Sequence, residues 1–284
     1  MSRIVYVNGE YLPEEDAKIS VFDRGFLMGD GVYEVSSVLD GKLIDNAAHI
    51  ARLERSLSEL KMDWPCTKEE LVEIQREIIR RNQVTEGAVY WQITRGAADR
   101  DFVFPKDAKP SLVMFSQLKN IVDVPAAKTG ISVITVPDIR WHRRDIKTVQ
   151  LLASSMAKMA AIDAGANDAW QVENGFVTEG SSNNAFIVTQ DGTLVTRNLS
   201  NDILHGITRR VILDLAEKEN LTVEIRPFTP QEAYEAEEAF ITSASSFVMP
   251  VVKIDDHKIG AGVPGPIALK LRKMYIEAAK ASAS

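Results

Sequence analysis

The stretch EGSSNNAFIVTQDGTLVTRNLSNDILHGITR, residues 179–209, changes its residue pattern twice within a short length. Its first part continues from DAWQVENGFVT, so strand-like runs alternate with turn dipeptides at Asn174-Gly175 and Asp191-Gly192. Runs rich in β-branched and aromatic residues between such dipeptides predict strands joined by tight turns. Gly206 then precedes ITRRVILDLAEKEN, whose apolar spacing predicts a helix. The stretch therefore predicts a β-meander that leads into a helix.

The rest of the chain mixes the same two periodicities. In the first half, strand-like segments such as GVYEVSSVLDGKLI precede two amphipathic helices, and the second helix begins at Thr67 with Glu70 completing a capping box. The segment NIVDVPAAKTG has the composition of a linker. This order predicts an α+β protein with two sheet-containing lobes, residues 1–120 and 130–284, joined by residues 121–129.

The composition excludes several classes of protein. The net charge of −7 provides no overall positive field that would recruit nucleic acid or an anionic membrane. We expect no signal peptide and no membrane span, because no apolar run is long enough. The single cysteine, Cys66, excludes an internal disulfide and is typical of a reducing cytoplasm. The four histidines lack metal-ligand spacing, so we expect no metal site.

Lys147 stands in DIRWHRRDIKTVQLLASSMAKMAA, directly before an apolar run. A lysine that is removed from water has a lowered pKa and can act as a neutral amine nucleophile. The alternative is that Lys147 ends a strand and extends its amino group into solvent. This segment alone favours the second interpretation.

Other segments carry groups that could bind an anionic ligand. Glu179 precedes a run of small polar residues, which indicates either a polar turn or a carboxylate held at a sheet edge beside a ligand. The backbone N–H groups after Gly206 and the hydroxyl of Thr208 form a potential anion site, or Gly206 is an ordinary loop residue. The loop TSASSF, residues 242–247, is also rich in hydroxyl donors, and Arg52 is either a phosphate ligand or a solvated helix residue.

Taken together, these groups match the requirements of one cofactor. Pyridoxal phosphate needs a lysine that bonds to its aldehyde, a carboxylate beside its ring nitrogen and several donors around its phosphate. Lys147, Glu179 and the donor-rich segments provide one of each.

Residues 179–209 resemble the signature of the fold-type IV pyridoxal-phosphate enzymes: Glu, a small residue, Asn, an aromatic residue, an apolar–x–Thr group and then LHGITR. DRGFLMGDGVYEV (23–35) and HIARL (49–53) are also similar to this family, so the resemblance spans nearly the whole chain. It implies a smaller N-terminal α/β domain, a larger C-terminal cofactor-binding domain with a mixed-sheet pseudo-barrel, and a cofactor at the domain interface.

The resemblance also implies roles for individual residues. Lys147 would bond to the cofactor and move the proton between the substrate Cα and C4′, while Glu179 would face the pyridine nitrogen. Leu204 would pack on the ring. The phosphate would be bound by a further set of residues: Arg52, Gly206, Ile207, Thr208, Ser243 and the backbone of Ala244. Ser245 could substitute for the hydroxyl residue that the family often has at the Ala244 position.

Within the family, the D-amino-acid transaminase branch is the most similar. That branch binds the substrate carboxylate with a tyrosine, an arginine and a histidine, the last two from the partner subunit of a homodimer. Tyr33 and Arg100 match, whereas Phe102 replaces the histidine. The resemblance therefore implies a cytoplasmic homodimer with Arg100 acting in trans. It would transfer the amino group of D-amino acids, and also of (R)-amines, to a keto acid such as 2-oxoglutarate or pyruvate through pyridoxamine phosphate.

Three alternatives remain open from the sequence. The first is a transaminase for L-branched-chain amino acids, which lacks the arginine loop. The second is a lyase of the aminodeoxychorismate type, whose loop usually reads Arg-Gly-Tyr where this chain has Arg100-Asp101-Phe102. The third is a non-catalytic cofactor-binding or scaffold protein in which Lys147 is structural.

Overall fold

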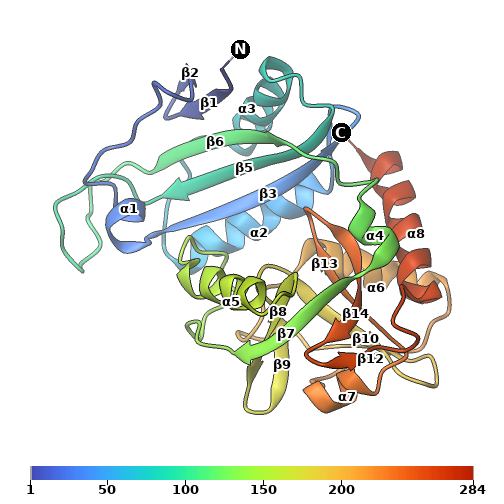
Figure 1. Ribbon diagram of the computed structural model, residues 1–284. Helices are drawn as coiled ribbons and strands as arrows, with labels where there is room; N and C mark the ends of the chain where they lie inside the picture. Colours follow the sequence, from blue (N-terminus) through green and yellow to red (C-terminus); the bar gives the residue numbers. More distant parts are fainter. Residues whose placement is uncertain (1, 284) are drawn as a thin grey trace. The chain divides into compact units, whose positions relative to one another are not determined.

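The computed structural model describes residues 2–283, which form two compact units (Figure 1). The first unit comprises residues up to 120, residues 146–150 and the C-terminal end from residue 282. The second comprises residues 121–145 and 151–281. The segment that contains Lys147 therefore packs with the first unit, although both of its neighbours in the chain belong to the second.

The first unit is built on an antiparallel sheet of six strands. In spatial order the strands are β2 (Glu10–Pro13), β1 (Ile4–Val7), β6 (Ser111–Leu118), β5 (Glu86–Thr94), β3 (Gly31–Leu39) and β4 (Lys42–Leu43). The turn between β3 and β4 has positive φ at Asp40 (51°) and Gly41 (75°). Positive φ at both central residues is the geometry of a tight hairpin, as the Asp-Gly dipeptide predicts.

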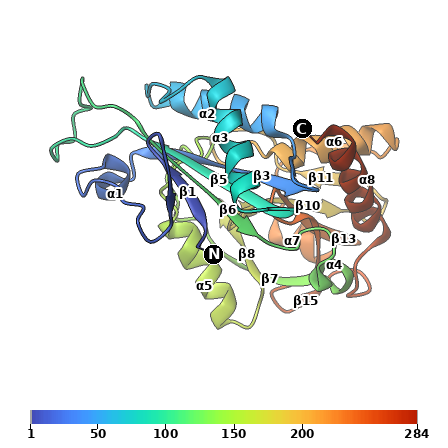
Figure 2. The same ribbon diagram turned by 90° about the horizontal axis from the view of Figure 1, so that it is seen from above.

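Helices α2 (Asn46–Glu59) and α3 (Lys68–Arg81) lie along this sheet (Figures 1 and 2). The capping box at the start of α3 is confirmed: Thr67 accepts from the Glu70 backbone N–H, and Glu70 accepts from that of Thr67. Apolar side chains from both helices and from five of the six strands form one core, which includes Leu53, Leu57, Leu71, Ile78, Val89 and Trp91. Short helix α1 (Arg24–Met28) precedes β3 and was not expected.

The second unit contains a mixed sheet of nine strands that curls until β9 contacts β10. In spatial order the strands are β12 (Val223–Ile225), β11 (Leu194–Thr196), β10 (Asn184–Val188), β13 (Glu238–Ser243), β14 (Phe247–Ile254), β7 (Ile131–Pro137), β8 (Asp168–Glu173) and β9 (Phe176–Gly180), with β15 (His257–Lys258) paired to β14. Buried side chains, among them Trp170 and Phe228, fill a core against this sheet. The predicted meander is correct only in part: its strands form two hairpins, β8–β9 and β10–β11, and β9 contacts β10 without being its neighbour in the hydrogen-bonded strand order.

Five helices accompany the sheet among the described residues: α4 (Pro125–Thr129), α5 (Leu152–Asp163), α6 (Ile207–Lys218), α7 (Pro230–Tyr234) and α8 (Pro266–Ser282). Strands β7 and β8 pair in parallel, so the chain must cross over between them. Lys147 and α5 both lie in this crossover. Residues 121–129, expected as a linker, contain α4, and Ile121 is buried.

The expected fold class is confirmed. An antiparallel sheet with helices in one unit and a curled mixed sheet in the other agree with the fold-type IV description. None of the helices within residues 2–283 is both long enough and apolar enough to span a bilayer.

Candidate active site

Lys147 is held beside β3 by backbone hydrogen bonds. The Tyr33 N–H donates to the Lys147 carbonyl (3.0 Å), and the Val149 N–H donates to the Gly31 carbonyl (3.0 Å). The lysine lies well after β7 ends at Pro137, so the strand-end interpretation is wrong. Its amino nitrogen lies 4.1 Å from the centroid of the Tyr33 ring, and the residue is half-buried. The backbone is thus fixed while the amine stands against an aromatic face.

Tyr33 begins a row of stacked rings across three neighbouring strands. Its centroid lies 5.3 Å from that of Tyr90, which lies 4.7 Å from that of Phe115. Burial raises the pKa of the Tyr90 hydroxyl, which donates to Gln92. Because successive side chains of a strand point to opposite faces, Tyr33 and Glu34 face opposite sides of the sheet. The row supports Tyr33 from behind and leaves its ring beside Lys147.

Arg52 on α2 is paired with a buried carboxylate. Its Nε and Nη2 atoms donate to the two oxygens of Glu34 (2.7 and 2.8 Å), and Nδ1 of His49 lies 2.8 Å from the same carboxylate. Although burial alone raises it, Arg52 and His49 bring the pKa of Glu34 down to about 2. The interpretation of Arg52 as a solvated residue is wrong, because only 9% of its side chain is exposed. Glu34 fixes the orientation of the guanidinium, and phosphate binding by Arg52 stays a prediction.

Glu179 is a buried carboxylate surrounded by donors. It accepts from Arg140 Nη1 (2.5 Å), from Asn184 Nδ2 (3.0 Å) and from the backbone N–H of Leu204 (3.1 and 3.2 Å). Burial raises the pKa of Glu179, and the guanidinium of Arg140 opposes that rise. The small residues after Glu179 are not open space: Ser181 and Asn183 donate to the buried Asp168.

Arg140 couples Glu179 to a second carboxylate. Its Nη2 donates to Asp138 (2.6 Å), which also accepts from the Thr178 hydroxyl (2.6 Å). Burial alone would lower the pKa of Arg140, but the carboxylates of Glu179 and Asp138 outweigh this effect, so the pKa lies above its ordinary value. This arginine therefore stays charged and holds the Glu179 carboxylate. The sequence analysis did not single out Arg140, because its burial and its two carboxylate partners appear only in the folded chain.

The start of α6 meets the same cluster through Asn184, which donates to the Leu204 carbonyl (3.0 Å). A Cβ atom on Gly206 would lie 1.9 Å from Asn184 Oδ1, so this position requires glycine. Ile207 and Thr208 form the first turn of the helix and are buried. Their backbone N–H groups lie where the helix dipole favours an anion. Nearby Arg209 is also buried, and burial lowers its pKa to about 10.

The turn between β13 and β14 gathers three hydroxyl groups. Ser243 Oγ lies 2.7 Å from Ser246 Oγ and 3.5 Å from Ser245 Oγ. The turn ends at Phe247, which is fully buried and has a φ of 57°. Such strain at a non-glycine residue persists only where the surroundings impose it, and it is common at functional sites.

Arg272 on α8 holds this turn through hydrogen bonds to its backbone. One of its nitrogens, Nη1, donates to the carbonyls of Ser246 and Val248 (both 2.7 Å). No sequence pattern indicated this anchor, because Arg272 lies far along the chain from the turn that it holds.

Arg100 and Phe102 lie on the loop between β5 and β6. Both are exposed, and 79% of Phe102 is accessible to solvent. The Arg100 guanidinium lies 5.6 Å from the Phe102 ring. The two predicted substrate-binding side chains thus present an apolar and a cationic group on one exposed loop.

The structure therefore gathers the predicted residues into two groups, one in each unit. The first unit holds Lys147, Tyr33, Arg52 and the Arg100 loop, and the second holds the residues around Glu179, α6 and the Ser243 turn. The second group suits the ring nitrogen and the phosphate of pyridoxal phosphate. A buried carboxylate can accept a hydrogen bond from a protonated ring nitrogen, and the helix start and the hydroxyls can bind a phosphate. The half-buried amine of the first group suits an aldehyde.

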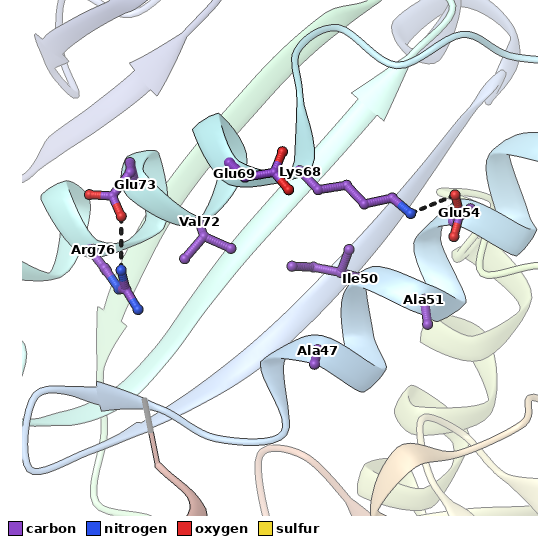
Figure 3. Close-up of a pocket in the computed structure, with 9 residues that line it drawn as sticks. All are labelled: Ala47, Ile50, Ala51, Glu54, Lys68, Glu69, Val72, Glu73 and Arg76. Carbon is purple, nitrogen blue, oxygen red and sulfur yellow. Dashed lines mark hydrogen bonds and ion pairs between the residues drawn. The ribbon is translucent and has the colours of Figure 1, made fainter.

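A groove between α2 and α3 lies outside both groups (Figure 3). Its charged side chains pair with one another: Lys68 with Glu54 (2.6 Å) and Arg76 with Glu73 (2.8 Å). None of its nine lining residues belongs to the predicted site. The groove is therefore separate from the candidate active site.

Comparison with known sequences identifies related proteins over almost the full length. The amino-transferase class IV family matches residues 31–254. A D-alanine aminotransferase from Staphylococcus haemolyticus is 39% identical over 279 residues, covering 96% of this chain and 98% of the relative. Another from Bacillus licheniformis is 36% identical over 265 residues, covering 93% and 92%.

Solved structures agree on the fold. The branched-chain aminotransferase of the thermophilic archaeon Thermoproteus uzoniensis, solved with norvaline, has a TM-score of 0.88 at 26% identity, covering 98% of this chain and 94% of the other. A branched-chain amino acid aminotransferase solved with pyridoxamine 5'-phosphate has a TM-score of 0.90 at 28% identity, covering 99% and 95%. That of Escherichia coli has a TM-score of 0.86 at 23% identity, covering 98% and 95%, which supports the fold alone.

Proposed function

Because this chain belongs to the class IV aminotransferase family, whose members depend on pyridoxal phosphate, we propose that it transfers the amino group of D-amino acids to a keto acid such as pyruvate or 2-oxoglutarate. The observation that carries the proposal is the similarity to D-alanine aminotransferases at 36–40% identity over more than nine-tenths of the chain. The branched-chain enzymes share the fold at 23–28% identity. The Arg100 loop also favours the D-specific branch.

We assign cofactor binding to both groups of residues. Lys147 would bond to the aldehyde, and Glu179 would accept a hydrogen bond from the ring nitrogen. Leu204 would pack on the ring. The phosphate ligands would be Arg52, Gly206, Ile207, Thr208, Ser243 and Ala244. The support is chemical: Arg140 keeps the buried Glu179 beside a positive charge, and Glu34 orients Arg52.

Each residue then has a distinct task in the reaction. When bound, pyridoxal phosphate supplies a carbonyl that accepts the donor amine and a ring that accepts the electron pair of the broken Cα–H bond. Once the donor amine has replaced it at the aldehyde, Lys147 would remove the proton from Cα of the donor and deliver it to C4′. Glu179 holds the proton of the ring nitrogen, with Arg140 limiting the basicity of the carboxylate. Tyr33 lines the side of the amine.

Arg100 is assigned to the substrate carboxylate, and Phe102 makes this part of the site less polar than a histidine would. We propose that apolar D-amino acids and (R)-amines are therefore accepted alongside D-alanine. A single free cysteine is consistent with a reducing compartment, so we place the enzyme in the cytoplasm.

We further propose a homodimer in which Arg100 serves the partner's site. Helix α5 supports this, because Leu152, Met156, Met159 and Ile162 expose 52–76% of their surface along one face. The first unit also exposes Phe22, Phe26, Phe102 and Val103. Contiguous apolar faces of this kind usually mark an interface between subunits.

A donor panel tests the proposed activity. D-alanine, D-glutamate, L-leucine and (R)-1-phenylethylamine would each be offered to the purified enzyme with 2-oxoglutarate, and the keto products measured. We expect D-alanine to be preferred over L-leucine. Lys147→Ala should abolish turnover and the visible absorbance of the bound cofactor, whereas Lys158→Ala, at an exposed α5 lysine, should change neither. A preference for L-leucine would assign the enzyme to the branched-chain group instead.

A further inference from the structure

Three charged residues form a buried cluster at the base of the Arg100 loop. Asp30 accepts from Arg24 Nε (2.7 Å) and from Arg95 Nε and Nη2 (2.8 and 3.1 Å). At most 10% of each side chain is exposed. Arg95 also donates to the carbonyls at the end of α2, Leu60 (2.8 Å) and Lys61 (3.1 Å). The cluster is therefore tied to α1, β3, β5 and α2, which are rigid parts of the first unit.

The cluster contacts the loop on both sides of Phe102. On one side, Arg24 Nη1 donates to the backbone carbonyl of Asp101 (2.6 Å). On the other, the Arg95 guanidinium lies 3.7 Å from the centroid of Phe104, within the range of a cation–π contact. The Asp101 carboxylate in turn accepts from the Val103 N–H (3.1 Å). The loop tip is thus fixed although its side chains are exposed.

The base of the loop is fixed by the same elements. The Arg24 N–H donates to the Gly96 carbonyl (2.9 Å), and the Ala98 N–H donates to the Phe22 carbonyl (3.2 Å). Gly96 has a φ of 92°, and a Cβ there would lie 1.9 Å from the Lys109 carbonyl oxygen. Both ends of the loop therefore meet closely at this point.

Stability alone does not explain this arrangement. Two guanidinium groups share one carboxylate, and a buried ionic cluster often stabilises a fold no better than apolar residues of the same volume. A hydrogen bond from a buried arginine to one loop carbonyl, however, defines a position. Asp101 directly follows Arg100 in the chain, so the bond to its carbonyl limits where the Arg100 side chain begins.

We propose that Arg24 and Arg95, held together by Asp30, are positioning residues that set the place of Arg100 and Phe102 and thereby select amino donors that carry a carboxylate. This inference rests on the proposed function, because it takes Arg100 as the carboxylate ligand. It assigns donor selectivity to α1 and to the base of the loop in addition to the exposed tip.

The test compares Arg24→Lys with the wild-type holoenzyme. Lysine keeps the charge beside Asp30 but lacks the planar fork that reaches two acceptors at once. For D-alanine we expect KM to rise about tenfold, as for one lost charged hydrogen bond, with kcat within about twofold. For D-alaninol, which has a hydroxymethyl group in place of the carboxylate, the single-turnover constants should not change. The absorbance of bound cofactor should also stay the same.

A second measurement does not depend on activity. Hydrogen exchange of the backbone over residues 97–104 should be faster in Arg24→Lys than in the wild type, with α3 as the internal reference. Phe104→Leu provides a variant that is safe for folding, because half of this ring is exposed. It should raise KM for D-alanine about threefold, since it removes the cation–π contacts of the ring with Arg95 and Arg24 and leaves the hydrogen bond to Asp101.

The outcomes separate the two proposals. If the wild type transfers no amino group from any donor, the proposed function is wrong, and the exchange data still decide whether the cluster holds the loop. If Arg24→Lys weakens the reaction with both donors equally, or leaves the KM for D-alanine and the exchange rates unchanged, the positioning role is wrong.

Discussion

Glu34 is the residue whose charge contributes most clearly to stability. Its pKa falls to about 2 on folding from an ordinary value of 4.5, so the ionised form is favoured in the folded state. A carboxyl with a depressed pKa stabilises the fold above its unfolded pKa and loses that contribution as the pH falls through the folded value. Glu34→Gln should therefore destabilise the protein at pH 7 by roughly 3 kcal/mol.

Thermal unfolding between pH 2 and pH 7 measures this effect. The difference between Glu34→Gln and the wild type should shrink as the pH falls from about 4.5 to about 2. Glu77→Gln is the matched control: its pKa is also lowered to about 2 by two arginines, but Glu77 lies at an exposed ion pair and should matter little. Equal effects of the two substitutions would contradict the role of burial.

Glu179 has the opposite relation to stability. Burial raises the pKa of Glu179 above its unfolded value of 4.5. The ionised carboxylate is therefore less favourable in the folded chain than in the unfolded chain, and the fold loses stability as the pH rises above the unfolded pKa. In the cofactor-free protein, Glu179→Gln should leave the unfolding temperature unchanged or raise it. The same substitution should weaken cofactor binding at least about tenfold, because a ring-nitrogen proton loses its anionic acceptor.

Titration with pyridoxal phosphate, followed by absorbance, gives the affinity, and calorimetry of the cofactor-free chain gives the unfolding temperature. Gln171→Glu is a useful contrast, because it places a charge at a buried position where Oε1 has no hydrogen-bond partner among the described residues. It should lower the unfolding temperature. A Glu179→Gln variant that melts early and binds the cofactor normally would contradict the assignment.

Single residues were predictable where patterns in the sequence carry them. The interest of Lys147, Glu179 and Gly206 came from the three segments taken together and from the resemblance of residues 179–209, because each segment alone also allows an ordinary structural role. Arg140 and Asn184 were not predicted, because each matters through partners that only folding brings close. The role of Glu34 was missed for the same reason, since Arg52 and His49 lie on a separate helix.

The start of α6 depends on one glycine. Gly206→Ala would force its Cβ within 1.9 Å of Asn184 Oδ1, so the helix start or the Asn184–Glu179 contact must move. Since the lost contact is a charged hydrogen bond, we expect cofactor affinity to fall at least about tenfold while the sheet persists. Gly192→Ala, in the β10–β11 turn, is the control: it has open space around the added atom but a φ of 85°.

Both variants should lose some unfolding temperature, but only Gly206→Ala should change the cofactor titration. If Gly192→Ala changes the cofactor titration as much as Gly206→Ala does, the close approach of Asn184 to Gly206 does not matter for cofactor binding.

Elements were predicted in proportion to their length and periodicity. The helices α2, α3 and α6 and the strands around the Asn-Gly and Asp-Gly turns correspond to the sequence patterns. The five-residue helices α1, α4 and α7 were missed, because one turn of helix shows no periodicity. The apolar run after Lys147 forms helix α5, and its exposed apolar face was not predicted.

The whole molecule provides a test of the proposed dimer. Mixed dimers of Lys147→Ala and Arg100→Ala chains, purified through two different tags, contain one site with both residues if Arg100 acts in trans. They should show about half the wild-type activity, since one site of two is complete. If Arg100 serves its own chain, the mixed dimers should be as inactive as either parent variant.

Leu152→Glu together with Met156→Glu should shift the chain towards a monomer in light scattering and lower its activity, because both substitutions place charge on the exposed face of α5. Lys158→Gln, which keeps a polar group at an exposed position of the same helix, should leave the assembly unchanged. A monomeric wild type with full activity would contradict the dimer.

At this scale the sequence did not predict how the chain is divided. Residues 146–150 belong to the first unit, although the residues on either side of them belong to the second. Sequence position alone assigns them to the C-terminal half, since the contacts that hold them, backbone hydrogen bonds to β3 and the packing of Ile146 in the first unit's core, join residues far apart in the chain.

That assignment has a consequence for chimeras between relatives. A crossover made at residue 120 would take the reactive lysine from one parent and the strand that orients it, with Tyr33, from the other. Residues 146–150 and the beginning of β3 should therefore come from the same parent. A chimera that takes them from different parents would combine two segments whose contacts were never selected together.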